Sequence, residues 1–241
     1  MRIAVISDVH GNLTAFDAVV ADLKTVGADL VVHGGDLASH GSRPGNVIDA
    51  IQTFGWHGVR GNTDEMLWRP ELYGESLRKH PSRRGLRQVL FSEFAPATRE
   101  LIGDARLDWL KTQPTEWQAN AVAVMHASPG DLWRAPLIDA TDAELIAVYG
   151  SSRAETVVYG HIHRPFVRRL ASLLVANSGS VSLSYDGDTR ASYAVYDDGS
   201  VTVRRVAYDV EREIRELHAV GYPRADWLSS VLRSGSYVPP L

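Results

Sequence analysis

The chain has 241 residues, enough for one large α/β domain, and its 44% hydrophobic and 22% charged residues are typical of a globular protein with a sizeable core. The formal net charge of −4 gives no overall electrostatic reason to expect nucleic-acid or membrane binding. The absence of cysteine excludes disulfides and thiolate metal sites and fits a reducing compartment. No export signal follows Met1 and no stretch approaches the ~20 apolar residues of a membrane helix, so we expect a cytoplasmic protein with no membrane partner.

The first sixty residues alternate between strand-like and helix-like segments. Residues 2–7 and 29–33 are apolar runs typical of strands buried on both faces, and 56–60 predict a third short strand. An amphipathic helix follows Asn12, which occupies the N-cap position, and a second helix is predicted over 44–54. This strand–helix–strand–helix–strand order predicts a parallel sheet with right-handed crossovers.

The periodic pattern is lost from 65 to 96, a stretch rich in Arg, Pro, Gly and aromatic residues that could form a lid or small cap. Beyond it the pattern predicts, in chain order, a helical hairpin around 97–112, a strand over 121–126, a helix over 139–149, a strand over 156–160, short strands to 208, and helices over 209–218 and 223–233. Asp186-Gly187 and Asp198-Gly199 are hairpin signals among the short strands. No repeat, low-complexity tract or linker is present, so we expect one domain over 1–241 whose C-terminal helices lie within 209–233.

Side chains that commonly bind metals follow five of these runs, at the point where each run ends. In chain order, the clusters are Asp8-Val9-His10, Gly35-Asp36, Gly61-Asn62, His126 and Gly160-His161-Ile162-His163. Because ligands of open α/β sheets bind beyond the carboxyl ends of the strands, we expect these clusters to converge on one edge. Asp8 and His10 are separated by one residue, as are His161 and His163. Both members of such a pair can reach one centre only if the backbone leaves regular strand geometry.

The chemistry of these side chains indicates two metal ions. Two carboxylates, four imidazoles and one amide suit Mn, Fe, Zn, Co or Ni better than Ca or Mg. Seven groups are too many for one ordinary site, but they suit two ions that share a bridging carboxylate. With two divalent ions, two aspartates and a bridging hydroxide, the site would carry a net charge of about +1 and attract a phosphate.

The ordered motifs resemble those of the calcineurin-like metallophosphoesterase superfamily. The motifs that carry the resemblance are Asp8-x-His10, Gly35-Asp36, Gly61-Asn62-x-Asp64, His126 and Gly160-His161-x-His163. The likeness covers roughly residues 1–208. It is closest to the small bacterial and archaeal phosphodiesterase branch, which is similar at His126-Ala127-Ser128-Pro129 and at Asn177-Ser178-Gly179-Ser180-Val181. The second of these segments is expected to form a turn that supports the site.

The resemblance implies an α/β fold in which a two-sheet β-sandwich is flanked by helices and carries two divalent transition-metal ions, with Mn favoured. By the same resemblance, Asp8, His10, Asp36 and His163 hold the first ion, and Asp36, Asn62, His126 and His161 hold the second. Asp36 would bridge the ions, and a metal-bound hydroxide would be the nucleophile. Asp36 and Asn62 are therefore expected to take part in catalysis.

One position departs from the family pattern. Many members carry a histidine directly after the Gly-Asn pair, where it can protonate the leaving group, whereas this chain has Thr63. A threonine hydroxyl is far too weak an acid for that role near neutral pH. Asp64 supports that histidine in the family, so its role here is open. His40 is the candidate for another acid, and reliance on good leaving groups is the alternative.

Asn12, Asn62 and Arg84 are the candidate substrate-binding residues. Asn12 fits the N-cap of the first helix, and that helix N-terminus could face a phosphate. Arg84 belongs to the stretch 69–87, which is either a basic lid that attracts an anionic substrate or a solvated loop face. The charged residues of this stretch are Arg69, Arg78, Lys79, Arg83, Arg84 and Arg87, with Glu71 and Glu75.

These features predict dinuclear-metal-dependent hydrolysis of a small phosphate ester, with a phosphodiester of the nucleotide type favoured. The enzymatic alternatives are a phosphomonoesterase, including a protein phosphatase, and a dinucleoside polyphosphate hydrolase. The alternative of another class is a metal-dependent binding or scaffold protein with little turnover, since retromer-type relatives use this fold for protein interaction. Because the chain lacks a broad basic surface, we expect no stable nucleic-acid partner. The sequence leaves the oligomeric state open.

Overall fold

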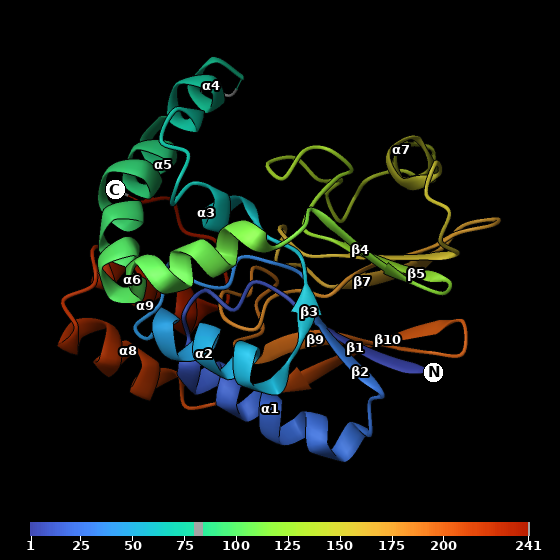
Figure 1. Ribbon diagram of the computed structural model, residues 1–241, viewed down its shortest axis with the longest axis horizontal. Coiled ribbons are helices and arrows are strands. Elements are labelled where there is room, and N and C mark those ends of the chain that lie inside the picture. Colours follow the sequence, from blue (N-terminus) through green and yellow to red (C-terminus); the bar gives the residue numbers. More distant parts are fainter. Residues whose placement is uncertain (80–83, 241) are drawn as a thin grey trace.

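Two five-stranded mixed sheets pack against each other and carry helices on their outer sides (Figure 1). This computed structural model describes residues 1–79 and 84–240. The arrangement confirms the predicted α/β fold, a two-sheet β-sandwich flanked by helices.

The first sheet contains the three strands predicted at the start of the chain. It consists, in spatial order, of β10 (Ser200–Val206), β9 (Ala191–Asp197), β1 (Arg2–Ile6), β2 (Leu30–His33) and β3 (His57–Gly58). β1 and β2 are parallel, as are β2 and β3, which confirms the predicted parallel pairing. β9 is antiparallel to both β1 and β10.

The second sheet is built from the later strands. Its spatial order is β4 (Glu116–Ala119), β5 (Val122–Met125), β6 (Thr156–Tyr159), β8 (Leu174–Asn177) and β7 (Phe166–Arg169). β5, β6 and β8 are parallel neighbours, whereas the edge strands β4 and β7 run antiparallel to the strands beside them. The parallel strands β1, β2, β3, β5 and β6 are the ones whose carboxyl ends carry the predicted ligands.

Apolar side chains from both sheets form the layer between them. Along β1, Ile3 and Val5 belong to this layer, together with Val124 of the second sheet. Ala4 and Ile6 instead join the core beneath the helices. Successive side chains of a strand point to opposite faces, so the apolar run of β1 is buried on both sides, as its sequence predicts.

Helices cover the outer faces of both sheets. Those that pack on the first sheet are α1 (Leu13–Val26), α2 (Pro44–Phe54), α6 (Ala95–Thr112), α8 (Val210–Ala219) and α9 (Ala225–Ser234). The second sheet is covered by α7 (Asp142–Tyr149). In the part of the chain that the structure describes, no helix combines the length and the apolar character needed to cross a membrane.

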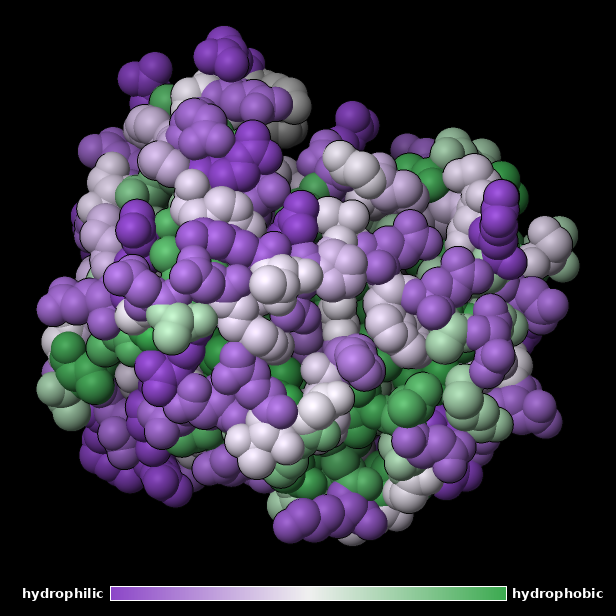
Figure 2. Space-filling model, in the orientation of Figure 1, coloured by the Kyte–Doolittle hydropathy of each residue, from purple (hydrophilic) through white to green (hydrophobic). Residues whose placement is uncertain are grey.

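The stretch that lacked a periodic pattern, 65–96, contains short helical elements. They are α3 (Asn62–Glu65), α4 (Leu72–Lys79), α5 (Arg84–Val89) and the π-helix η2 (Leu90–Phe94), which leads directly into α6. Figure 1 shows α4 and α5 projecting beyond the sandwich, and Figure 2 shows that this lobe presents a largely hydrophilic surface. His80 and Arg83, which belong to the basic stretch, lie outside the described residues. A lid role for 65–96 stays a prediction.

Two local features differ from what the sequence predicts. The range around 97–112, expected to be a helical hairpin, does contain two helical segments, and they meet at a kink at Gly103, where φ of 69° leaves the helical region. The edge strand β4 was not predicted, because alternate residues of it are exposed and its sequence is mostly polar. It forms because β5 offers it an antiparallel partner.

The structure confirms one of the two predicted Asp-Gly hairpin turns and contradicts the other. Asp198-Gly199 joins β9 to β10 with φ of 45° and 77°, as expected for a two-residue hairpin turn. The hairpin predicted at Asp186-Gly187 is wrong, since residues 178–190 contain no strand. Its turn lies instead in the long connection between β8 and β9.

His33 ends β2 and is fully buried. Burial lowers the pKa of its imidazole to about 4, from an ordinary value of 6.5. Between these values the unfolded chain binds a proton that the folded chain does not. His33 therefore contributes stability above pH 6.5 that is lost as the pH falls toward 4. When the pH is lowered from 7 to 5, we expect the free energy of unfolding to fall by about 1–2 kcal/mol less in His33→Leu than in the wild type.

Urea unfolding of the metal-free wild type and variant at both pH values measures this difference. Equal losses in the two proteins would show that His33 does not titrate differently in the folded and unfolded chains.

Candidate metal centre

The carboxyl ends of the ligand-bearing strands meet at one edge of the sandwich, where the two sheets are joined by hydrogen bonds. Within the first sheet, the amide of Asp8 donates to the carbonyl oxygen of Gly35 (3.0 Å). From the second sheet, Nδ1 of His126 reaches the carbonyl oxygen of Gly34 (2.9 Å). The structure brings together at this edge all seven predicted ligands: Asp8, His10, Asp36, Asn62, His126, His161 and His163.

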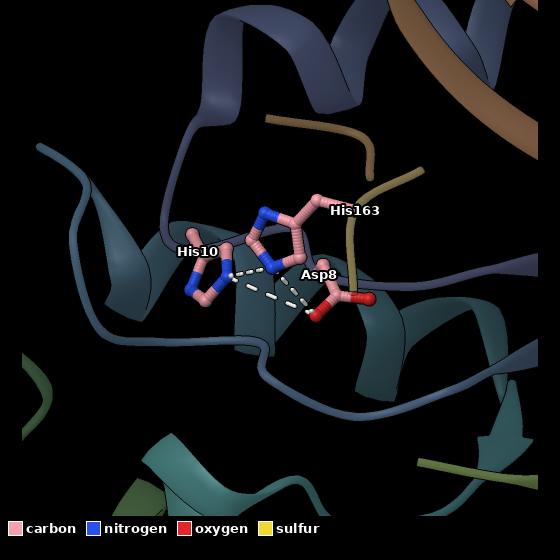
Figure 3. A group of neighbouring side chains, drawn as sticks. All are labelled: Asp8, His10 and His163. Carbon is pink, nitrogen blue, oxygen red and sulfur yellow. Dashed lines mark hydrogen bonds and ion pairs between the residues drawn. The ribbon is translucent and has the colours of Figure 1, made fainter. Parts of the chain in front are cut away.

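Asp8, His10 and His163 form the first of two ligand groups (Figure 3). Oδ1 of Asp8 lies 3.0 Å from Nε2 of His163 and 3.9 Å from Nε2 of His10. The two Nε2 atoms are 3.3 Å apart. All three side chains are buried, and their ligand atoms point toward one another.

Asn62, His126 and His161 form the second group. Oδ1 of Asn62 lies 2.9 Å from Nε2 of His126 and 2.8 Å from Nδ1 of His161. The two ring nitrogens are 3.2 Å apart. His161 is only partly buried, so this side of the centre is the one closest to solvent.

Asp36 lies between the two groups. Its Oδ2 is 3.9 Å from Nε2 of His10 and 3.5 Å from Nε2 of His126. Asp8, Asp36 and His126 also offer atoms that all lie within 4.8 Å of one another. One buried carboxylate thus faces both sets of nitrogen ligands.

The spacing of these atoms fits metal coordination. Two ligand atoms that each lie ~2.1 Å from one ion, at octahedral or tetrahedral angles, are ~3.0–3.4 Å apart. The separations of 3.3 Å between His10 and His163 and of 3.2 Å between His126 and His161 fall in this range. The nitrogen and oxygen donors suit divalent transition metals.

Backbone carbonyls fix the orientation of three of the imidazoles. Nδ1 of His10 lies 2.9 Å from the carbonyl oxygen of Ser39, and Nδ1 of His163 lies 2.5 Å from that of Leu183. His126 is held in the same way. A carbonyl oxygen can only accept, so each Nδ1 carries the proton and each Nε2 keeps its lone pair for a metal.

The ligand residues leave strand geometry, as the spacing of the two pairs predicts. Asp8 and His10 have φ of 55° and 51°, and His161 and His163 have φ of 66° and 56°. Asp36 has φ of 53°. Residues other than glycine rarely adopt this left-handed conformation, and here it turns side chains two positions apart toward one centre.

The electrostatics of the site suit a bound cation. Burial raises the pKa of Asp36 to about 7; His126 opposes this shift, whereas the carboxylates of Asp64 and Asp8 add to it. Burial also lowers the pKa of His10 well below its ordinary value. The imidazole therefore stays neutral and able to bind a metal, while positive charge between the aspartates would stabilise their ionised forms.

Comparison with known proteins agrees with the motifs and the geometry. The family model described as "Calcineurin-like phosphoesterase superfamily domain" matches residues 1–199. The chain belongs to this superfamily.

Three similar proteins match nearly the whole length of this phosphoesterase. An uncharacterized protein of Methanocaldococcus jannaschii is 27% identical over 256 residues, covering 97% of this chain and 98% of the relative. The structure of a metallophosphoesterase from Sphaerobacter thermophilus has a TM-score of 0.78 and 24% identity, covering 98% of this chain and 100% of the other. A hypothetical protein from Pyrococcus horikoshii has a TM-score of 0.80 and 18% identity, with coverage of 98% and 99%.

In this phosphoesterase, structural roles fall to Thr63, which stands where many family members have a histidine, and to the neighbouring Asp64. The amide of Thr63 donates to Oδ1 of Asp36 (2.9 Å), while its buried Oγ1 has no hydrogen-bond partner among the described residues. Asp64 accepts from the amides of Leu37 (2.9 Å) and Gly61 (3.0 Å). Its buried carboxylate thus ties the loop after β2 to the loop after β3.

His40 lies against a metal-ligand candidate. Its ring makes edge contacts with His10, at a centroid distance of 4.7 Å, and with Phe94, at 4.8 Å. Burial lowers the pKa of His40 to about 3, so the ring is neutral near neutral pH. A neutral imidazole is a very weak acid, and this environment argues against the predicted proton-donor role.

Asn12 and Arg84 have different surroundings. Oδ1 of Asn12 accepts from the amide of Ala15 (2.9 Å), which confirms the N-cap, and its Nδ2 donates to Oγ of Ser182 (3.1 Å). Arg84 is exposed at the start of α5, whereas Arg87, one turn later, is buried. Substrate binding by Asn12, Asn62 and Arg84 stays a prediction.

One site neighbour was missed by the sequence reasoning. The ring of Tyr185 stacks on His163 with a centroid distance of 4.5 Å and an interplanar angle of 15°. No motif or periodicity marks Tyr185, because it comes from the irregular connection between β8 and β9. Only the folded arrangement places it beside the centre.

Close packing at Gly61 generates a prediction about metal affinity. A Cβ atom on Gly61 would lie 2.0 Å from Oδ1 of Asp36, so Gly61→Ala must displace that carboxylate. We expect metal titration of the stripped variant to show binding at least about tenfold weaker than in the wild type. Gly85→Ala in α5 is the control, since no described atom lies within 4 Å of the added carbon. Equal metal affinity in both variants would contradict this account of the packing.

Proposed function

We propose that this chain hydrolyses phosphate esters at a centre of two divalent transition-metal ions, with Mn favoured, and that small phosphodiesters of the nucleotide type are its preferred substrates. The observation that carries the proposal is the position of Asp36. Its Oδ2 lies 3.9 Å from Nε2 of His10 and 3.5 Å from Nε2 of His126. A buried carboxylate that faces two ligand groups suits two ions that share one ligand.

Each ion would have its own ligands besides Asp36. Asp8, His10 and His163 would hold the first ion, and Asn62, His126 and His161 the second. When bound, two divalent ions polarise phosphoryl oxygens and lower the pKa of water, which supplies the chemistry of an in-line displacement at phosphorus. The completeness of this ligand set argues against a binding or scaffold protein with little turnover.

The chain's own residues determine how a substrate reaches this centre. Asp8, His126 and His163 are buried, whereas His161 is partly exposed. Access is therefore on the side of His161, and the remaining sides are closed to bulk water. A site with so little water strengthens the electrostatic stabilisation of charge that develops at the phosphate.

The preference for diesters rests on the candidate acids and on the family resemblance. Thr63 has a hydroxyl that is too weak an acid, and His40 is buried and neutral with a pKa of about 3. Both observations favour substrates whose leaving group departs without help from a strong general acid. The resemblance to the phosphodiesterase branch adds support. The alternative uses of the same centre are a phosphomonoesterase, including a protein phosphatase, and a dinucleoside polyphosphate hydrolase.

The first experiment compares an aryl phosphodiester with the matching aryl phosphomonoester. Metal-stripped protein is resupplied with Mn, Ni, Zn or Mg, and turnover is measured for both substrates. We expect metal-dependent turnover that is faster for the diester. Faster turnover of the monoester would refute the diester preference and favour the phosphomonoesterase alternative. No turnover of either substrate, from protein that binds two ions, would favour the binding role.

Removing single ligands tests the metal mechanism. We expect Asp36→Asn and His161→Ala each to lower kcat/KM at least about 100-fold, because each removes a ligand that orients an ion at the reaction centre. Asp17→Asn, on the exposed face of α1, is the matched control and should leave kcat/KM unchanged. Circular dichroism checks that the variants stay folded. Wild-type turnover in both ligand variants would refute the dinuclear mechanism.

Restoring the family histidine tests the missing-acid interpretation. We expect Thr63→His to accelerate hydrolysis of esters with poor leaving groups by about 10–100-fold, and to change good leaving groups much less. The measurement is kcat/KM across a series of aryl esters with phenols of increasing pKa. Equal acceleration across the series would mean that the histidine does not act as a proton donor.

A further inference from the structure

The loop that follows β2 orients His10, one of the first group of candidate ligands (Figure 3). Nδ1 of His10 lies 2.9 Å from the carbonyl oxygen of Ser39, so the direction in which Nε2 points depends on the position of this loop. The loop also lies close to the His10 backbone, since a Cβ atom on Gly41 would be 2.0 Å from the carbonyl oxygen of His10. A displacement of residues 39–42 would therefore turn the imidazole of His10.

Loop 39–42 contains a strained residue and needs support from other parts of the chain. His40 has φ of 84°, a left-handed value that residues other than glycine rarely adopt. Ser39, His40 and Ser42 are all buried. Buried amides need acceptors within the protein. The amides of His40 and Ser42 find theirs in the C-terminal part of the chain, on side chains of α8 and of the turn that follows it.

Tyr222, in the turn between α8 and α9, supports the strained residue. Its hydroxyl oxygen accepts a hydrogen bond from the amide of His40 (2.8 Å). The same hydroxyl lies 2.9 Å from Oγ1 of Thr98 in α6, to which it can donate. The side chain of Tyr222 is 3% exposed, so water does not compete for these bonds. The hydroxyl thus fixes the position of His40 relative to α6 and to the C-terminal helices.

Glu213 of α8 supports the next part of the loop. Its Oε1 accepts from both the amide (3.2 Å) and the hydroxyl (2.8 Å) of Ser42. Its Oε2 accepts from Oγ1 of Thr14 in the first turn of α1 (2.8 Å). The side chain is 1% exposed, and a buried carboxylate persists only when it is paired or hydrogen-bonded in this way. Glu213 therefore ties α8 both to loop 39–42 and to the start of α1.

The second group of candidate ligands is held by different elements. Nδ1 of His126 lies 2.9 Å from the carbonyl oxygen of Gly34, directly after β2. The amide of Gly34 in turn donates to the carbonyl oxygen of Ile6 in β1 (2.7 Å). Hydrogen bonds between strand ends thus fix the carbonyl oxygen that orients His126. The carbonyl oxygen that orients His10 belongs to a loop that the C-terminal helices hold.

We propose that Glu213 and Tyr222 are positioning residues for the first metal site, the one that includes His10, and that they act by holding loop 39–42. Both residues lie beyond residue 199, where the match to the phosphoesterase domain ends. The C-terminal helices thus have a part in metal binding besides covering the first sheet. This inference rests on the proposed function, because it assumes a metal ion at His10.

Metal titration of the stripped protein measures the effect on each site. Calorimetry with Mn²⁺ should show two ions bound to the wild type. We expect Tyr222→Phe and Glu213→Ala each to weaken the binding of one ion about 10–100-fold and to leave the other within about twofold, as loss of a group that orients a ligand does. Glu213→Gln should restore part of the loss, because its carbonyl oxygen can still accept from Ser42.

Two control variants separate this effect from a general loss of stability. Tyr193→Phe removes a buried tyrosine hydroxyl that donates to Asp22 of α1 (2.6 Å) rather than binding the loop. Glu211→Ala removes another carboxylate of α8, one that is exposed and pairs with Arg233 (2.7 Å). We expect both controls to bind two ions as the wild type does. Equal weakening of both ions in Tyr222→Phe, or the same weakening in the controls, would overturn the inference.

A second substitution identifies the site that is affected. Because Tyr222 would act through His10, Tyr222→Phe should weaken the ion that remains in His126→Ala. It should have no further effect on the ion that remains in His10→Ala. Equal effects in the two backgrounds would show that Tyr222 does not act through His10, and the positioning role would then be wrong.

Nitrogen-15 spectra of the histidine rings separate this inference from the proposed function, because they require neither metal nor turnover. In the metal-free protein, the Nδ1 proton that His10 donates to Ser39 should exchange with water at least about tenfold faster in Tyr222→Phe than in the wild type, while that of His126 is unchanged. This result from a protein that binds fewer than two ions would uphold the positioning role and refute the proposed function. Unchanged exchange at His10 would refute the positioning role, whether or not the protein hydrolyses phosphate esters.

Discussion

The candidate metal centre depends on a backbone conformation that L-amino acids rarely adopt. Asp8, His10, Asp36, His161 and His163 all have φ between 51° and 66°. Each left-handed residue costs on the order of 1–2 kcal/mol, so five of them offset a sizeable part of the net stability of an ordinary domain. The surrounding structure has to hold these residues in this conformation. Because it does, two side chains from one strand end can face the same candidate metal site.

Hydrogen bonds across the strand ends hold this conformation. The amide of Asp8 donates to Gly35 O (3.0 Å), and the amide of His10 donates to Asp36 O (2.9 Å). From the other sheet, Oγ of Ser180 donates to Asp8 O (2.8 Å), which confirms that the segment after β8 supports the site. The ligands of the first sheet are thus fixed partly by the second. Loosening the packing between the sheets would therefore disturb the geometry of the candidate ligands.

Local sequence signals predicted which candidate ligands lie together, but not all of their neighbours. A polar residue directly after an apolar run is placed by strand direction alone, and the spacing of Asp8 and His10 also predicted their departure from strand geometry. The edge strand β4 forms by pairing with its sequence neighbour β5, and its mostly polar, half-exposed residues carry no apolar run that would have marked it. Tyr185 is likewise unmarked, since its stacking on His163 exists only in the folded protein.

The candidate ligands differ in how far they are buried. Under the proposed function, the buried ones would hold the metal ions, and residues near the exposed side would contact the phosphate ester. Asp8 and His126 are fully buried by the sandwich, whereas His161 is partly exposed. Under the proposed function, a substrate meets the protein on the side of His161. Substitutions on that side that leave the strand ends intact can change which phosphate ester binds without moving the candidate ligands, because the strained backbone that positions them is held by hydrogen bonds across the strand ends.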